Sequence, residues 1–330
     1  MHSSLIAWIL RAIPFGTIIM YGALGETVTE KSGNLNLGVP GIMYLGGFAG
    51  FASAWAYENT AANPSGAVSV VIALTCAILA SMAGGLIYAF LTISLRANQN
   101  VTGLALTTFG MGVANFFGVF ILNGASYSAA PIANKAFSAK IPVLSTLGGF
   151  GQVVFSYGFL VYAAIALAIA LHWFLTRTRA GLNLRAVGEN PATADAAGIN
   201  VTLYKYLATC IGAGICGIGG LYYVLDYNQG IWATTGQIEA LGWLAVALVI
   251  FTTWKPLNAI WGAYLFGMLY WLYQFLPSLL GITLASYMTD LVQMLPYVVT
   301  IVVLIVVSMR KKKENQPPAH LGLAYFREER

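Results

Sequence analysis

Long apolar runs alternate with short polar segments along almost the whole chain. A helix that crosses a bilayer needs about 20 mainly apolar residues, and runs of about that length recur nine times. The pattern therefore predicts an all-α integral membrane protein with about nine transmembrane helices. The expected spans are Leu5–Leu24, Leu37–Tyr57, Ala67–Leu95, Val101–Leu122, Val153–Leu175, Leu203–Leu225, Gln237–Trp254, Pro256–Leu276 and Thr289–Met309.

The same pattern suggests how the chain is divided. Residues 1–310 are predicted to form a single transmembrane domain, with a polar cytoplasmic tail over 311–330. The longest external connection, 123–152, contains Pro131 and Pro142. It is predicted either to carry a short surface helix or contact an external partner, or else to form an ordered cap over the bundle.

Composition agrees with a membrane protein, and the positions of the charges predict its orientation. The chain is 58% hydrophobic and only 8% charged, whereas soluble domains carry about 25% charged residues. Positive charge collects in cytoplasmic loops, so the side with more Lys and Arg is expected to face inward. An inside C-terminus and an outside N-terminus place thirteen of the sixteen basic residues inside: Lys31, Arg96, Arg177, Arg179, Arg185, Lys205, Lys255, Arg310, Lys311, Lys312, Lys313, Arg327 and Arg330. The net charge of +5 is thus a membrane feature, and no nucleic-acid partner is expected.

Several classes of chemistry lack the residues they need. No acid falls at the middle of a predicted span, although proton relays use such residues. Cys76, Cys210 and Cys216 lie in apolar runs without metal-ligand spacing, and the three histidines are scattered. The chain has no phosphate-binding Walker A motif. We therefore expect no catalytic residue, no metal site and no cofactor in this chain.

Uncharged polar residues are the candidates for a solute pathway. Two stretches, GNLNLGVPG from Gly33 and RANQNVTG from Arg96, open predicted spans with clustered amide side chains. Capping of helices and hydrogen bonding between them are the alternative roles. The candidate pathway residues are Asn34, Asn36, Asn98, Asn100, Thr107 and Asn115. Such a pathway would recognise a polar, neutral solute by hydrogen bonds.

A polar segment between the fifth and sixth predicted spans carries strong helix signals. Asn190 is a good N-cap, Pro191 suits the first helical position, and Gly198 can end the helix in a left-handed turn. These signals predict a helix of about two turns over Pro191–Ala197. A helix this short is marginal alone in water. It is therefore expected to pack either on its own protein or in the groove of a partner.

These motifs together resemble a known family of transport proteins. GNLNLGVPGIMYLGG, NQNVTGLAL and RAVGENPATADAAGIN, followed by Lys205-Tyr206-Leu207, are similar to the permease subunits of bacterial ABC importers. The branch includes ribose, branched-chain amino acid and nucleoside permeases. The spacing and the C-terminal HLGLAYFREER look most like the smaller permease of nucleoside (simple-sugar) systems. The region around Gln237, Glu239 and Thr252-Thr253 departs from the expected basic, glycine-rich pattern.

The resemblance implies partners and a role for the short helix. It implies a cytoplasmic ABC ATPase subunit, a second homologous permease in a heterodimer, an extracellular substrate-binding lipoprotein and a place in the bacterial plasma (inner) membrane. ATP and magnesium would be held by the ATPase partner. The helix would be the coupling helix, about 190–198, seated in a groove of that ATPase. The residues that match this motif are Glu189, Asn190, Pro191, Asp195, Ala196, Gly198 and Ile199.

The function predicted from the sequence is the import of a polar neutral solute, with nucleosides favoured. The alternatives within the family are a simple sugar and a branched-chain amino acid. A stand-alone secondary transporter or channel would also explain the polar span residues, but it does not explain the capped helix and lacks an ion-coupling site. A membrane-embedded enzyme is disfavoured because no reactive cluster is present.

Overall fold

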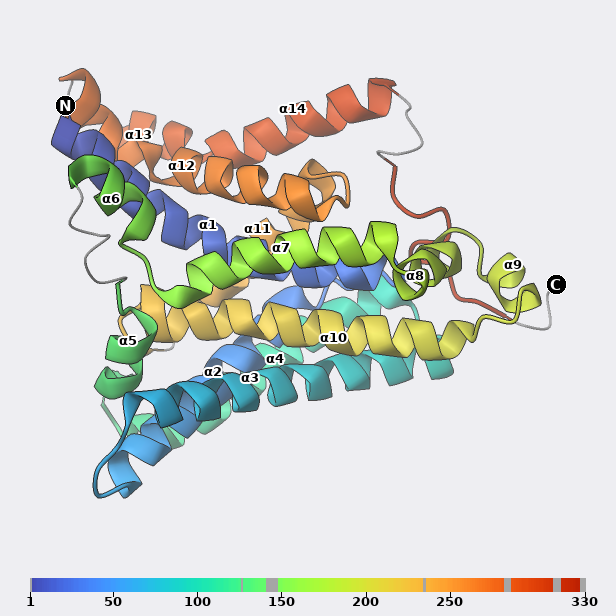
Figure 1. Ribbon diagram of the computed structural model, residues 1–330, viewed down its shortest axis with the longest axis horizontal. Helices are drawn as coiled ribbons and strands as arrows, with labels where there is room; N and C mark the ends of the chain where they lie inside the picture. Colours follow the sequence, from blue (N-terminus) through green and yellow to red (C-terminus); the bar gives the residue numbers. More distant parts are fainter. Residues whose placement is uncertain are drawn as a thin grey trace.

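The computed structural model describes residues 2–125, 127–140, 148–233, 236–281, 286–310 and 316–326. In these ranges almost all regular structure is helical, as the apolar pattern predicts. The long helices run roughly along one axis (Figure 1). The N-terminus lies at one end of this bundle, and α8 (Arg179–Glu189), α9 (Pro191–Ala196) and the C-terminal segment lie at the other.

The remaining elements complete the bundle and its two ends. The long helices are α1 (His2–Glu30), α2 (Val39–Thr60), α3 (Gly66–Ala89), α4 (Gln99–Leu122), α7 (Phe159–Arg177), α10 (Val201–Tyr222), α11 (Gln237–Phe251), α12 (Pro256–Leu280) and α14 (Leu295–Arg310). The shorter ones are α5 (Pro131–Phe137), α6 (Gly148–Phe155) and α13 (Ser286–Gln293). α3 and α10 continue into π-helical turns, η1 (Phe90–Ser94) and η3 (Tyr223–Tyr227). Two short antiparallel strands, β1 (Ser128–Ala129) and β2 (Ile231–Trp232), join the loop after α4 to the loop after η3.

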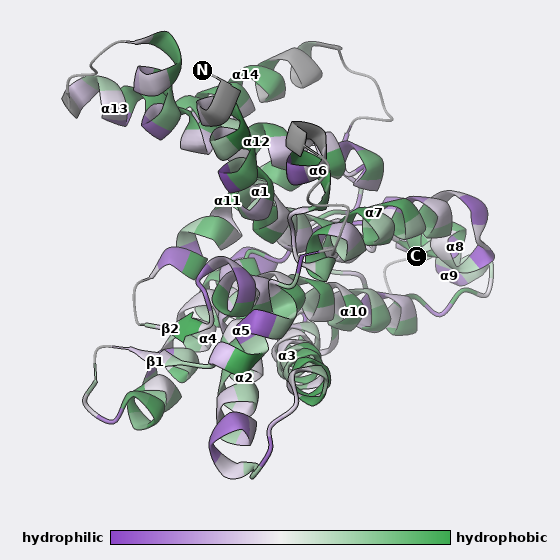
Figure 2. Cartoon of the chain, turned by 60° about the vertical axis from the view of Figure 1, so that its left-hand side comes forward, coloured by the Kyte–Doolittle hydropathy of each residue, from purple (hydrophilic) through white to green (hydrophobic). Residues whose placement is uncertain are grey.

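Several helices have the length and apolarity that a bilayer requires. In the described ranges, five helical stretches are long and apolar enough to cross a membrane, and α11 is a shorter apolar helix. The five are Ser4–Glu30, Gly66–Ser94, Gln99–Leu122, Phe159–Arg177 and Val201–Tyr227. Hydrophobic residues cover most of the helices, whereas hydrophilic residues gather at loops and around α8 and α9 (Figure 2). The expected all-α membrane protein is confirmed at this level.

The fifth and ninth predicted spans are each broken into two helices, so the sequence-based boundaries are wrong there. Val153–Leu175 is interrupted between α6 and α7, where a side chain at Gly158 would overlap the Phe137 carbonyl. The break lets the chain turn closely against α5. Thr289–Met309 is interrupted between α13 and α14. Pro296 occupies the first turn of the second helix, because proline has no amide proton to continue a preceding one.

α10 is the buried centre of the bundle. In its most apolar stretch 78% of the residues are buried, against 28% in α3, α4 and α7. Glycines allow this burial, because small residues let helix backbones approach closely. A Cβ at Gly220 would overlap the Met43 carbonyl of α2, and one at Gly217 would overlap the Ser81 hydroxyl of α3. The more exposed α3, α4 and α7 face outward, as helices do when they contact lipid or another subunit.

Candidate functional site

α9 forms as its sequence predicts, within one residue at its end. The Asn190 Oδ1 accepts a hydrogen bond from the Thr193 amide at 3.0 Å, and Pro191 occupies the first turn. The Gly198 backbone adopts the left-handed conformation (φ +83°), which ends the helix. Asn200 then caps α10 by accepting from the Leu203 amide at 3.0 Å. Two adjacent caps thus fix both the start of α9 and the start of α10.

One face of α9 packs on the protein and the other is exposed. Ala194 is buried in a small apolar cluster with Val187 of α8 and Val201 of α10, and Ile199 packs against its rim. The outward residues are Thr193, Ala196, Ala197 and Gly198. These side chains are short, so the outward face of α9 is smooth and easily fitted into a groove of another protein.

The two acids of the motif bind the chain's own C-terminal segment. The Asp195 Oδ2 accepts a hydrogen bond from the Tyr325 hydroxyl at 2.9 Å. The Glu189 Oε2 accepts one from the Ala319 amide at 3.3 Å. The predicted coupling residues therefore divide into two groups. Ala196 and Gly198 are outward, whereas Asp195 and Glu189 connect α8 and α9 to residues 316–326.

The C-terminal segment 316–326 ties together all three sequence motifs at this end of the bundle. The His320 amide donates to the Gly188 carbonyl at 3.0 Å, and the Gly322 amide donates to the Gly33 carbonyl at 3.1 Å. The Gln99 side chain donates to the Leu323 carbonyl at 3.4 Å. Burial, and the positive charge of nearby Lys205, lower the pKa of His320. An uncharged imidazole at neutral pH suits this already basic end.

Tyr325→Phe is expected to loosen this segment without unfolding the bundle. The variant removes one hydrogen bond to a carboxylate, an interaction worth about 1.5–3 kcal/mol. We expect faster amide exchange at residues 318–325 and faster proteolysis there, with an unchanged melting temperature for the bundle. Tyr287→Phe is the matched control, since its ring is 66% exposed on α13 at the other end. Unchanged exchange in the Tyr325 variant would contradict the anchoring role.

The candidate pathway residues near Gly33 have structural contacts. The Asn34 side chain donates to the Thr209 hydroxyl at 3.2 Å, and the Thr107 hydroxyl donates to the Leu37 carbonyl at 3.0 Å. The Asn36 Oδ1 accepts from the Gly38 amide at 2.9 Å. These bonds join the loop 33–38 to α4 and α10. They give the three side chains a positioning role and leave their part in a solute pathway as a prediction.

The other candidate pathway residues are spread along α4. Asn98 is the N-cap of α4 and accepts from the Val101 amide at 3.1 Å, while Asn100 is exposed. Asn115 lies further along the helix, and its Oδ1 is buried without a hydrogen bond. The structure thus places the predicted pathway residues along α4 and in the loop before α2.

Two buried acids lie where the sequence indicated a loop. α1 extends six residues beyond the predicted span end at Leu24, so it includes both Glu26 and Glu30. Their exposed fractions are 0% and 2%. The Glu26 Oε1 accepts from the Asn36 amide at 2.9 Å, and the Glu30 carboxylate accepts from the Trp254 indole. Asn36 follows Glu26 by ten residues, whereas Trp254 lies 224 residues from Glu30. The burial of the two acids depends on this packing, which no local sequence signal marks.

An aromatic cavity lies near the end of α10 opposite α9, among α1, η3, α11, α12, α13 and α14. Its volume is ≈ 570 Å³. The rings that line it are Phe15, Tyr223, Tyr227, Tyr270, Trp271, Tyr273 and Tyr297. Gln237, Asp290 and Gln293 add polar groups to its wall. Sequence reasoning missed this cavity because its rings come from four separate segments.

Ordered stacking inside the cavity suits a flat ligand. The Phe15 and Tyr270 rings are stacked with centroids 4.1 Å apart, and Tyr223 stacks on Tyr227 at 5.8 Å. The Gln237 Oε1 accepts from the Tyr223 hydroxyl at 2.7 Å. Gln237 belongs to the region that departs from the family pattern, so that departure lies at the wall of this cavity. In the described residues no group of three His, Cys, Asp or Glu is placed to hold a metal ion.

Comparison with known proteins gives a consistent result. The family described as the permease component of the branched-chain amino acid transport system matches residues 8–305. A putative glucose ABC transporter permease of Haloferax volcanii is 35% identical over 81% of this chain and 77% of its own length. A guanosine ABC transporter permease of Bacillus subtilis is 33% identical over 74% and 75%, respectively. A nucleoside ABC transporter permease of Lactococcus lactis subsp. cremoris is 30% identical over 88% of both chains. The chain therefore belongs to this permease family and is a membrane subunit of an ABC transporter, multi-pass in the plasma membrane.

Proposed function

We propose that this permease imports nucleosides, with energy from ATPase subunits that dock on α9. The observation that carries the coupling role is the capped, small-faced helix at one end of the bundle. Its inward face packs on α8 and α10, so a force applied to its outward face reaches α10 directly. α10 and η3 then run without interruption from Val201 to Tyr227. This continuous helix ends at the aromatic cavity, because Tyr223 and Tyr227 line the cavity wall.

The proposed topology has nine crossings, with the N-terminus outside and the C-terminus inside. Alternate long helices run in opposite directions between the two ends of the bundle, in the order α1, α2, α3, α4, α7, α10, α11, α12 and α14 (Figure 1). α8 and α9 share one end with the basic turns at Lys31, Arg96 and Lys255. The positive-inside rule supports placing this end in the cytoplasm.

The aromatic cavity supports nucleosides as the solute. A nucleobase has a flat π-face that stacks on tyrosine and tryptophan rings. The amide groups of Gln237 and Gln293 can donate to, and accept from, a base edge or a ribose hydroxyl. Two of the relatives are named as nucleoside or guanosine permeases, and one as a glucose permease. Simple sugars and branched-chain amino acids are thus the competing solutes.

The proposal includes the partners expected of the family. These are ABC ATPase subunits that hold ATP and magnesium, a second permease and an extracellular substrate-binding lipoprotein. The exposed phenylalanines on α4, among them Phe116 and Phe120 at 61% and 68%, give a surface suited to lipid or to that second permease. The permease itself carries out no covalent step.

Transport in cells that produce the complete importer tests the solute and its site together. Labelled guanosine uptake should require ATP and be reduced by unlabelled uridine but not by glucose or leucine. Tyr297→Ala removes a half-exposed ring (48% exposed) from the cavity wall. Base–aromatic stacking is worth about 1–3 kcal/mol, so uptake at low substrate concentration should fall about 5- to 150-fold.

Tyr287→Ala is the control for that experiment. Tyr287 is on α13 beside the cavity but does not line it. Its variant should transport normally. Glucose or leucine competition would contradict nucleosides as the solute, and normal uptake by the Tyr297 variant would exclude the aromatic cavity as its site. Uptake that survives ATP depletion would contradict the importer itself.

A further inference from the structure

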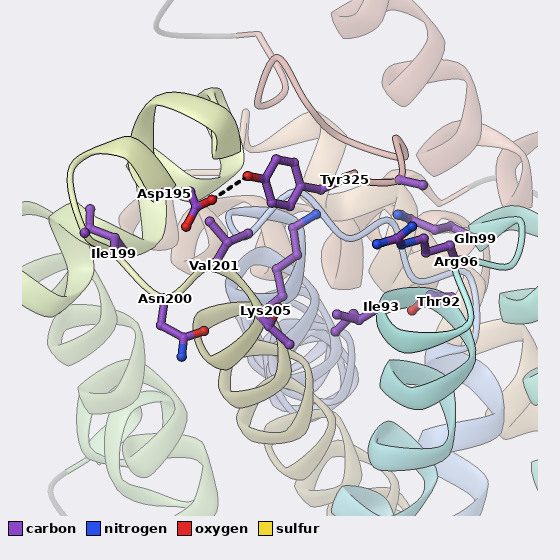
Figure 3. A pocket seen from close by; sticks show the side chains of 13 residues that line it. Thr92, Ile93, Arg96, Gln99, Asp195, Ile199, Asn200, Val201, Lys205 and Tyr325 are labelled. Atoms are coloured by element: carbon purple, nitrogen blue, oxygen red, sulfur yellow. Dashed lines mark hydrogen bonds between the residues drawn. The ribbon is translucent and has the colours of Figure 1, made fainter. Parts of the chain in front are cut away.

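A polar pocket lies beside α9, between the first turn of α10, the turn that joins η1 to α4, and the C-terminal segment (Figure 3). Its volume is ≈ 450 Å³. The side chains that define its chemistry are Arg96, Gln99, Asp195, Lys205 and Tyr325. The coupling role proposed for α9 uses its outward face, which borders this pocket at Gly198, whereas Arg96, Gln99, Lys205 and Tyr325 lie outside α9. The two cations of the pocket, Arg96 and Lys205, therefore have no task in that proposal.

Lys205 is the decisive residue of the pocket. It lies in the second turn of α10 and is only 3% exposed. Its ammonium is directed from α10 toward Tyr325 and the interior of the pocket (Figure 3). Among the residues that the structure describes, no hydrogen bond or ion pair to this ammonium is found. A buried charge is costly unless it is paired, so the pocket is built to hold a negative group.

Arg96 and the start of α10 also favour a negative group in the pocket. Arg96 lines it from the opposite side, and its backbone adopts a left-handed conformation (φ +55°) that non-glycine residues seldom take. Val201 and Thr202 lie at the start of α10, and in the described chain their amides donate no hydrogen bond. The free amides and the helix dipole at a helix N-terminus attract anions.

Negative charge in the lining is limited to one residue. Asp195 is the acid among the described lining residues, and its Oδ2 accepts from the Tyr325 hydroxyl. The Gln99 side chain is occupied as well, since its Oε1 accepts from the Leu35 amide at 2.7 Å. With two cations against one acid, the lining of the described pocket has a formal surplus of one positive charge.

We propose that this pocket binds a phosphate group at the inner face of the membrane. A phosphate offers several oxygen acceptors, which suits a lysine point charge, an arginine fork and backbone amides together. Two sources supply that group: the headgroup of an anionic phospholipid, or a free phosphate compound of the cytoplasm. Leu95 and Leu203, beside the pocket in the chain, are 60% and 51% exposed, so lipid tails would reach this position.

Binding by the purified full-length permease distinguishes the two sources. In one arm, inorganic phosphate is titrated at constant ionic strength and the melting temperature is followed. In the other, nanodiscs of phosphatidylcholine alone are compared with nanodiscs that also contain phosphatidylglycerol, and native mass spectrometry counts retained lipid. We expect a saturable gain in at least one arm, weakened tenfold or more by Lys205→Met and largely restored by Lys205→Arg.

Arg179→Gln is the control, because Arg179 is an exposed cation at the same end of the bundle but outside the pocket. It should bind as the wild type does. If Lys205→Met does not fold, Arg96→Gln tests the same pocket from its other wall. A response in the phosphate arm assigns a free phosphate, and one in the nanodisc arm assigns a lipid headgroup. No response in either arm, or equal binding by wild type and both pocket variants, would overturn the proposal.

Discussion

Replacing Ala196 by tryptophan is expected to reduce ATP-driven uptake about tenfold or more while leaving the permease folded in the membrane. Ala196 is exposed on the outward face of α9, so the larger ring extends away from the core of the permease. The helix keeps its Asn190 cap and its Gly198 end. A ring that protrudes from a smooth two-turn helix prevents it from seating in a groove. Overpacking of this kind costs about 1–3 kcal/mol in close-packed sites.

The measurements for this variant separate docking from folding. Uptake and ATP hydrolysis are followed in proteoliposomes that contain the complete importer, and the amount of ATPase recovered with the permease is determined after detergent extraction. Ala139→Trp is the matched control: Ala139 is an exposed alanine near the opposite end of the bundle. We expect the control to fold and to retain its ATPase. If the Ala196 variant retains both its ATPase and its uptake, α9 is not the docking surface.

Changes at Asn190 or Gly198 are less informative for the same question. Asn190 caps the helix, and its loss costs about 0.5–2 kcal/mol of local stability. Gly198 has a positive φ, so any side chain there strains the backbone, although open space surrounds it. Both changes would unwind α9 as well as alter its surface. Ala196 allows the surface to be changed while the helix is preserved.

The features that the sequence predicts well are those encoded over a few residues. α9 is an example, since Asn190, Pro191 and Gly198 stand at fixed positions on one short helix. Long apolar runs such as α3 and α4 are predicted for the same reason, because hydrophobic length and start signals are local. The interruptions of the helix before α7 and before α14 are harder to predict from the sequence. Both depend on how the chain packs at a glycine or a proline within an otherwise apolar stretch.

The features that the sequence does not reveal are those made by distant residues. Tyr325 meets Asp195 across 130 positions, and Trp254 meets Glu30 across 224. In the sequence, Glu26 and Glu30 resemble loop residues, because the apolar pattern places them after the end of the first predicted span. Only the fold shows that α1 continues and that both carboxylates are buried. The aromatic cavity escapes prediction for the same reason.

Because α10 is the buried centre of the bundle, Gly220→Val is expected to prevent stable folding. Any side chain at this position would overlap the Met43 carbonyl on α2. A backbone oxygen inside a helix cannot move aside as a flexible side chain can. The expected cost is about 3 kcal/mol or more, at the upper end of measured overpacking. α10 would be pushed from α2, and the path from α9 to the aromatic cavity would be displaced with it.

Gly112→Val tests whether the effect belongs to the close helix contact or to glycine itself. Gly112 lies on α4, and nothing stands within 4 Å of a Cβ built there. Its variant should change stability by only about 0.5 kcal/mol, as exposed substitutions usually do. The yield of monodisperse permease and its melting temperature in detergent are the quantities to compare. Equal stability of the two variants would show that α10 does not pack on α2 at Gly220. A selective loss at Gly220 would instead establish the rigid crossing through which a movement of α9 has to pass.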